Sequence, residues 1–108
     1  MMTEPSLIAP TTGADDILAD NDGYSLRVRV LNDQGLHARP AARLAQEAQK
    51  FTCDVHLRHD EADVDAKSIL DILTMAAGHG SELELRAHGP DAVAALRHLG
   101  ELFRNHFR

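Results

Sequence analysis

Four short segments of this sequence alternate apolar and polar residues, and this alternation restricts the possible folds more than any other feature. The segments are residues 24–30, 53–58, 62–66 and 82–86. Because successive side chains of a strand point to opposite faces, each segment predicts a strand with one buried face and one solvated face. Burial on one side only is typical of an antiparallel sheet whose helices all lie on the same side.

Three further segments have the spacing of amphipathic helices. The first carries apolar residues at i, i+3, i+4 and i+7, namely Ala41, Leu44, Ala45 and Ala48, just after Pro40. The second covers Ile69–Met75 and is preceded by Ser68. The third follows Gly89-Pro90-Asp91, and its apolar stripe runs from Val93 to Phe107. The sequence therefore predicts an α+β fold with the element order β-α-β-β-α-β-α.

The first 23 residues differ from the rest of the chain in charge. They contain five acidic residues and no Lys or Arg, whereas residues 24–108 contain 12 acidic and 11 basic residues. Proline, threonine and glycine recur in this part, although residues 16–19 are compatible with a marginal helical turn. We predict that residues 1–23 form an acidic, disordered leader and that residues 24–108 form one domain.

Composition excludes several classes of protein. The body of the chain is nearly neutral, has no basic stripe and contains one Tyr and no Trp, which disfavours nucleic-acid binding. No run approaches the ~20 apolar residues that span a bilayer, and residues 1–10 do not have the pattern of a secretory signal. The single cysteine, Cys53, cannot form an internal disulfide and fits a reducing compartment. We therefore expect a cytoplasmic protein that binds neither membranes nor nucleic acid.

The stretch from Gly35 to Ala41, GLHARPA, carries the strongest chemical signal. His37 occupies the last loop position before the first predicted helix, so its ring can lie beside the free backbone N–H groups of Ala38 and Arg39. The Arg39 guanidinium adds a permanent cation that can bind two phosphate oxygens at the same time. These groups suit accepting a phosphoryl group, whereas no metal cluster or water-activating base is present for hydrolysing one. The alternative is that His37 is only a polar loop residue.

Two motifs together resemble a known family. GLHARPA resembles the active-site signature of HPr, the histidine-containing phosphocarrier of the phosphoenolpyruvate:sugar phosphotransferase system. Residues 66–71, AKSILD, resemble the regulatory-serine segment of that family. The resemblance extends from about Tyr24 to Phe107, and the acidic leader departs from it. It implies an open-faced β-sandwich with strand order 1-4-2-3, and a phosphocarrier without cofactor or metal rather than an enzyme.

The resemblance also implies roles for individual residues. His37 would accept the phosphoryl group on Nδ1 from Enzyme I and pass it to an enzyme IIA, while Arg39 stabilises the phosphate and Ala38 offers its backbone N–H. Ser68 would be the target of HPr kinase/phosphorylase. Partner proteins would contact an apolar patch on a monomer, formed by Ile69, Leu70 and Leu73. The alternative is a regulatory module whose phosphorylation at His37 and Ser68 controls a partner.

Simpler explanations exist for several of these residues. Ser68 followed by Asp71 is a helix-cap signature that needs no kinase. Ile69 and Leu70 are adjacent in one short helix, so at most one of them can face the core. His56 and His59 are three residues apart, but they lie on a predicted strand and its turn and have no second pair or Cys partner at ligand spacing, which argues against a metal site. Cys53 starts a strand on its apolar face and is expected to be a core residue.

Overall fold

The computed structural model describes residues 16–108, so the predicted disorder of residues 1–15 lies outside the described part of the chain. The four predicted strands and three predicted helices are all present, and one further strand precedes them. In chain order the elements are β1 (Leu18–Asp20), β2 (Gly23–Arg29), α1 (Ala38–Ala48), β3 (Asp54–His59), β4 (Ala62–Asp65), α2 (Ile69–Met75), β5 (Glu82–His88) and α3 (Ala92–Arg104).

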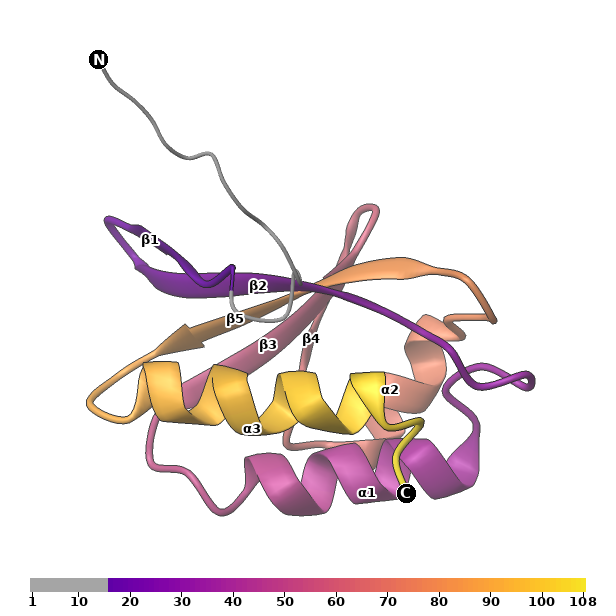
Figure 1. The fold of residues 1–108 in the computed structure, drawn as a ribbon. Helices are drawn as coiled ribbons and strands as arrows, with labels where there is room; N and C mark the ends of the chain where they lie inside the picture. The colour runs from indigo at the N-terminus through magenta and orange to yellow at the C-terminus, as the bar shows by residue number, and fades with distance from the viewer. Residues whose placement is uncertain (1–15) are drawn as a thin grey trace.

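The strands form one antiparallel sheet in the order β1-β2-β5-β3-β4. The four predicted strands thus have the expected order 1-4-2-3, with β1 added at the edge beside β2. Leu85 on the central strand β5 lies opposite Leu26 of β2 and Leu57 of β3, so the apolar residues form one continuous face. All three helices cover this face and leave the other open (Figure 1). The open-faced α+β sandwich is confirmed.

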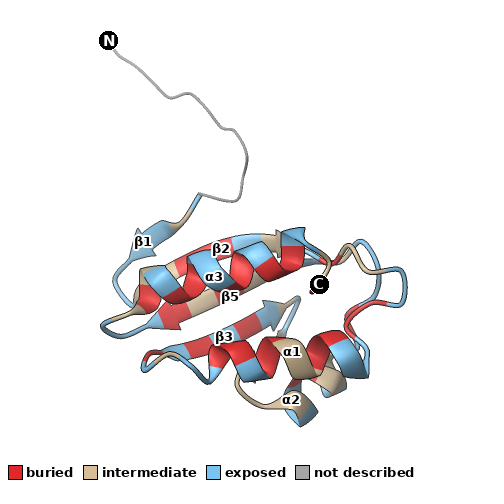
Figure 2. Cartoon of the chain, turned by 60° about the horizontal axis from the view of Figure 1, so that its bottom comes forward, coloured by how far each residue is buried: buried red, intermediate tan, exposed pale blue. Residues whose placement is uncertain are grey.

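The core lies between the sheet and the apolar stripes of the helices. Leu44 of α1 and both Leu96 and Leu99 of α3 are fully buried, whereas α2 buries only Ile72. In Figure 2 buried residues, in red, alternate with exposed ones along α1 and α3. Each such leucine stabilises the fold by about 1.5–3 kcal/mol relative to an exposed one. No helix in the described residues is long and apolar enough to cross a membrane.

The strand β1 lies within the segment predicted as leader. Residues 16–19 do not form the helical turn that their composition allowed. Leu18–Asp20 instead pair with the start of β2 across a tight turn at Asn21-Asp22. Asp20 Oδ2 accepts a hydrogen bond from Arg86 Nη2 at 2.9 Å, which holds the pKa of Asp20 below its ordinary value. The fold therefore begins before residue 24, at β1. Backbone pairing and one ion pair offset the weak apolar content of this strand.

The end of α3 also differs from the sequence prediction. The apolar stripe suggested a helix that continues to Phe107, but the helix ends at Arg104. His106 and Phe107 then adopt left-handed conformations, with φ of 59° and 60°. The Phe107 N–H donates to the Leu102 carbonyl at 2.7 Å and the His106 N–H to the Phe103 carbonyl at 3.3 Å, which is the pattern that satisfies the last carbonyls of a helix. Phe107 still reaches the core, through this turn.

Candidate functional site: His37 at the start of α1

The loop that leads from β2 to His37, residues 31–36, is held closely against the loop after α2. Its turn is closed by the Gly35 N–H, which donates to the Asn32 carbonyl at 3.0 Å, and the Leu36 N–H donates to the Ala77 carbonyl at 2.9 Å. Gly35 has a φ of +72°, and a Cβ at this position would lie 2.4 Å from the Ala77 oxygen. Glycine is therefore required at position 35 for both its backbone conformation and its close approach. We call residues 31–36 the His37 loop.

His37 is the N-cap residue of α1, as the sequence predicted. Its backbone is extended, with φ −78° and ψ −168°, and its carbonyl accepts the first helical hydrogen bond from the Ala41 N–H at 2.9 Å. The imidazole makes no capping hydrogen bond and is exposed. Within residues 16–108 it has no hydrogen-bond or ion-pair partner, in contrast to His56, His59 and His98. Its ring nitrogens are therefore accessible to an incoming group.

The first turn of α1 supplies groups that bind anions beside this ring. Ala38 and Arg39 are exposed, and their backbone N–H groups precede the first helical hydrogen bond. Pro40, which has no N–H, is buried in the same turn. Arg39 forms no ion pair with any residue in the described part of the chain. A helix N-terminus, an unpaired guanidinium and an exposed imidazole thus lie within three consecutive residues, which is an arrangement suited to a phosphoryl group.

The helix α2 packs against α1 with the opposite direction. At one end the Gln49 side chain donates to the Lys67 carbonyl at 2.8 Å, and at the other end Leu36 bonds to Ala77. Ser68 therefore lies near the C-terminal end of α1, away from His37. Its Oγ accepts a hydrogen bond from the Asp71 N–H at 3.2 Å, which confirms the predicted helix cap.

The apolar side chains next to Ser68 are exposed to different degrees. Leu70 is 71% exposed, whereas Ile69 and Leu73 are half-buried. This difference confirms that Ile69 and Leu70 do not both face the core. Leu70 and Leu18 are the two exposed large apolar residues in the described part of the chain. The predicted partner patch therefore centres on Leu70.

Comparisons with known proteins agree with this geometry. A family profile described as "PTS HPr component phosphorylation site" matches residues 24–105. The chain belongs to the HPr family. It is 54% identical over 80 residues to the phosphocarrier protein HPr of Treponema pallidum (strain Nichols), an alignment that covers 74% of this chain and 91% of that protein. It is 45% identical over 73 residues to the HPr-like protein Crh of Bacillus subtilis (strain 168), covering 68% and 86% respectively.

A solved structure gives the same result for the fold. The crystal structure of HPr-C-His from Thermoanaerobacter tengcongensis matches with a TM-score of 0.75 at 35% identity, covering 77% of this chain and 93% of that chain. Membership of the HPr family confirms the prediction that this chain is a phosphocarrier protein of the phosphotransferase system and not an enzyme. The match begins at residue 24, so β1 lies outside the region shared with the family profile.

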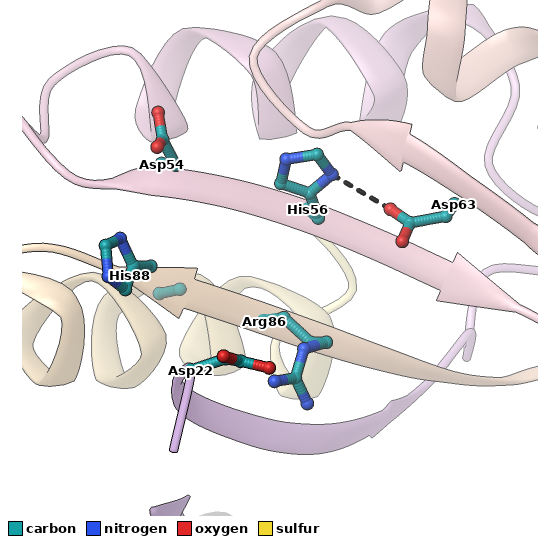
Figure 3. Close-up of a pocket in the computed structure, with 7 residues that line it drawn as sticks. Asp22, Asp54, His56, Asp63, Arg86 and His88 are labelled. Atoms are coloured by element: carbon teal, nitrogen blue, oxygen red, sulfur yellow. Dashed lines mark hydrogen bonds and ion pairs between the residues drawn. The ribbon is translucent and has the colours of Figure 1, made fainter. Parts of the chain in front are cut away.

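The open face of this HPr fold, which is the sheet surface away from the helices, carries a second cluster of charged groups. A hollow of about 240 Å³ on this face is lined by Asp22, Asp54, His56, Asp63, Arg86, Ala87 and His88. Figure 3 shows His56 turned toward Asp63, and their side chains are joined by a 2.9 Å contact. Within residues 16–108 no three side chains are grouped as metal ligands. His37 does not line this hollow, so the open face and the His37 region are separate.

A buried carboxylate joins α1 to α3, and the sequence pattern did not reveal it. Glu47 is buried although it lies outside the apolar spacing predicted for α1, which is Ala41, Leu44, Ala45 and Ala48. Its Oε1 lies 2.5 Å from His98 Nε2, and its Oε2 lies 3.0 Å from Lys50 Nζ. The hydrogen bonds from His98 and Lys50 lower the pKa of Glu47 to about 2. The sequence around Glu47 gave no indication of this partner, because His98 is 51 residues away.

Cys53 is a core residue, as expected. It is fully buried, and burial is the largest of the effects that raise the pKa of its thiol to about 11. The backbone N–H groups of Thr52 and Cys53 donate to the Asp91 carboxylate at 2.9 Å and 2.8 Å. The N–H of Thr52 lowers the pKa of Asp91 most strongly. A thiol in this environment is neutral at physiological pH and therefore a poor nucleophile.

Proposed function

We propose that this chain accepts a phosphoryl group on His37 from Enzyme I and transfers it to an enzyme IIA of a sugar phosphotransferase system. The observation that carries the proposal is the exposed, unpartnered imidazole of His37 at the N-terminus of α1, next to Arg39, which has no ion-pair partner among residues 16–108. Both groups belong to the GLHARPA motif inside the region that matches the HPr family.

The transfer exchanges one phosphorus–nitrogen bond for another. The lone pair of His37 Nδ1 attacks the phosphorus of the donor's phosphohistidine, and the bond from phosphorus to the donor nitrogen breaks as the new bond forms. The backbone N–H groups of Ala38 and Arg39 and the Arg39 guanidinium bind the phosphoryl oxygens. Because the bond broken and the bond formed are of the same kind, the group is passed on without a large change in free energy.

Transfer of this kind needs short-lived complexes with each partner. An interface of modest area gives the fast dissociation that a carrier requires. Such transient docking suits a carrier that acts as a monomer in the cytoplasm. The patch of Ile69, Leu70 and Leu73 is the surface proposed for docking, since Leu70 is exposed on α2, the helix that packs on α1.

Ser68 supports a second candidate function, in which the chain regulates a partner. Ser68 is partly exposed at the start of α2 and directly precedes the docking patch, so a kinase such as HPr kinase/phosphorylase has access to its hydroxyl. The similarity to a relative named HPr-like protein Crh favours keeping this alternative. A phosphate on Ser68 would act on partner binding rather than on His37, because Ser68 lies at the opposite end of α1.

The proposed function is tested by incubating the chain with Enzyme I and phosphoenolpyruvate and measuring its intact mass. We expect a gain of one phosphate that is lost in acid and retained in base, as is characteristic of phosphohistidine. Adding an enzyme IIA should then remove it. Transfer to an enzyme IIA separates the carrier from a purely regulatory module, for which phosphorylation would only change affinity for a partner.

The matched variants are His37→Ala and His56→Ala, which each remove one exposed imidazole. His37→Ala should take up no phosphate and melt near the wild-type temperature, because its exposed ring has no hydrogen-bond or ion-pair partner within residues 16–108. His56→Ala should be phosphorylated normally, since His56 lies on the open face and contacts Asp63. Uptake of an acid-labile phosphate by His37→Ala would disprove the assignment of the site.

A further inference from the structure

The C-terminal turn, residues 105–108, adopts an unfavourable backbone conformation. Both His106 and Phe107 lie in the left-handed region, with φ of 59° and 60°, which non-glycine residues rarely adopt. The conformation is held by the hydrogen bond from the Phe107 N–H to the Leu102 carbonyl. It is also held by the Phe107 ring, which packs edge-on against Phe103 with ring centroids 4.8 Å apart. The core thus fixes this turn in place.

The C-terminal turn contacts the His37 loop through one side chain. Asn32 Nδ2 donates a hydrogen bond to the His106 carbonyl at 3.0 Å, across 74 residues of sequence. The other atom of the same amide, Asn32 Oδ1, is buried and has no hydrogen-bond partner within the described residues. A buried acceptor without a partner lowers stability. The net contribution of this amide to stability is therefore small, which points to another role for its contact with the turn.

The opposite side of the His37 loop is held by a third left-handed residue. Ala76, with a φ of 54°, ends α2 and sets the position of the Ala77 carbonyl, which accepts from the Leu36 N–H. Among residues 16–108 there are four left-handed residues other than glycine, and Asp60 is the one that lies elsewhere, in the hairpin between β3 and β4. The other three flank the loop that delivers His37. Strained residues gather at sites where geometry must be held fixed.

We propose that Asn32 is a positioning residue for phosphoryl transfer. Its hydrogen bond to His106 fixes the His37 loop against the C-terminal turn, while the bond from Leu36 to Ala77 fixes the other side. Held from both sides, the loop sets the direction in which the His37 ring leaves the start of α1. Asn32 precedes His37 by five residues and acts through the loop. This inference rests on the proposed function, because it assumes that His37 is the phosphoryl acceptor.

The test compares Asn32→Ala and Asn32→Asp with the control Asn105→Ala. Asn105 also lies in the C-terminal turn and donates through its amide Nδ2, but its acceptor is Glu101 Oε1 of α3 at 3.5 Å and not an atom of the His37 loop. Asn32→Asp keeps the size of the side chain but cannot donate to the His106 carbonyl. Each variant is phosphorylated by Enzyme I and phosphoenolpyruvate over a range of chain concentrations, which separates kcat from KM. Hydrogen exchange at the Leu36 amide and the melting temperature are measured on the same samples.

We expect both Asn32 variants to lower kcat by about two- to tenfold, the effect of one neutral hydrogen bond that positions a reacting group, with KM nearly unchanged. The Leu36 amide should exchange faster in both Asn32 variants and at the wild-type rate in Asn105→Ala. Wild-type kcat in both Asn32 variants, or unchanged Leu36 exchange, would overturn the positioning role while leaving the proposed function intact. A wild-type chain that takes up no phosphate would overturn the proposed function itself, and the positioning role with it.

Discussion

The open face of the sheet and the start of α1 both carry cationic side chains, but these side chains differ in whether they form ion pairs. Each of the four arginines of the open face forms an ion pair with a carboxylate within the fold, and these are Arg27, Arg29, Arg58 and Arg86. At the start of α1, Arg39 has no such partner among the described residues, and neither has the imidazole of His37. The charges of the open face are therefore balanced internally, whereas those beside His37 are available to an external anion.

Under the proposed function, this difference separates a surface that keeps the sheet solvated from a surface that binds an anion. Exposed ion pairs contribute little to stability, typically less than about 1 kcal/mol each, so the open face mainly prevents unbalanced charge next to the sheet. An unpaired guanidinium next to free backbone N–H groups has no such internal role. Under the proposed function, an incoming phosphoryl group would complete the hydrogen bonds that the fold leaves open there.

The sharpest test of the comparison changes one arginine on each surface to lysine. Arg39→Lys replaces a bidentate guanidinium with a single ammonium and should slow transfer both to and from His37 by at least several-fold, because one charge-assisted contact is worth about 1.5–3 kcal/mol where it is fully made. Arg27→Lys, on the open face, should be phosphorylated at the wild-type rate. Both variants should keep the wild-type melting temperature. Equal rates for the two variants would break the distinction between the surfaces.

Ser68 variants test whether the docking patch is also separate from the acceptor site. Ser68→Asp places a negative charge at the start of α2, where it is favourable to the helix, so the melting temperature should be retained while acceptance from Enzyme I slows. Ser68→Ala removes the bond to the Asp71 N–H and should lose about 0.5–2 kcal/mol of stability with near-normal acceptance. Normal acceptance by Ser68→Asp, or its unfolding, would reduce Ser68 to a helix cap.

The buried Glu47 provides a test of stability at the end of α1 that is remote from His37. Its folded pKa of about 2 lies below the ordinary value of 4.5, so its stabilising effect is complete above about pH 4.5 and is lost as the pH falls toward 2. Glu47→Gln should therefore lower the free energy of unfolding at pH 7 by on the order of 1–2 kcal/mol, and the difference should shrink in acid.

Glu101→Gln is the matched control for this measurement. Glu101 is exposed and pairs with Arg104 within α3, so the loss should stay below about 0.5 kcal/mol at pH 7. Chemical denaturation at pH 7, 4 and 2.5 would measure both variants. A pH-independent difference for Glu47→Gln would show that its packing rather than its charge stabilises the contact between α1 and α3.

The smallest effect is expected at the edge of the sheet. Asp20→Ala removes the ion pair with Arg86 on the surface and should lower the melting temperature by no more than a few degrees. Phosphorylation of His37 should be unchanged, because β1 lies beside the beginning of β2 and the His37 loop follows its end. Slower phosphorylation of Asp20→Ala would show that the two regions are coupled through the sheet.

The sequence predicted the features that arise from local periodicity. The alternation around Leu26, Val55 and Leu83 predicted the sheet and its buried face, and the Ser68–Asp71 pair predicted the start of α2 correctly. The position of His37 before a helix was also predicted, because proline and the apolar spacing mark the helix start.

The features that the sequence did not predict depend on contacts between distant residues or on backbone pairing. The strand β1 has little apolar content and pairs through its backbone, although Asp22-Gly23 was a turn signal that pointed to it. The burial of Glu47 depends on His98, and the end of α3 depends on a turn that brings Phe107 to the core. The residues 32–35 indicated a turn, but nothing local showed that Asn32 bonds to His106.

The position of β1 determines which end of the chain is better suited for immobilising the protein on a surface. In Figure 1 the β1 hairpin lies at one end of the sheet, while the loop before α1 and the C-terminus lie toward the other. Immobilisation on a surface or a sensor through the N-terminal side therefore presents the start of α1 to solution. A tag joined after Arg108 would instead follow directly on the turn that contacts Asn32. Measurements of phosphoryl exchange on immobilised protein should use the N-terminal side for attachment.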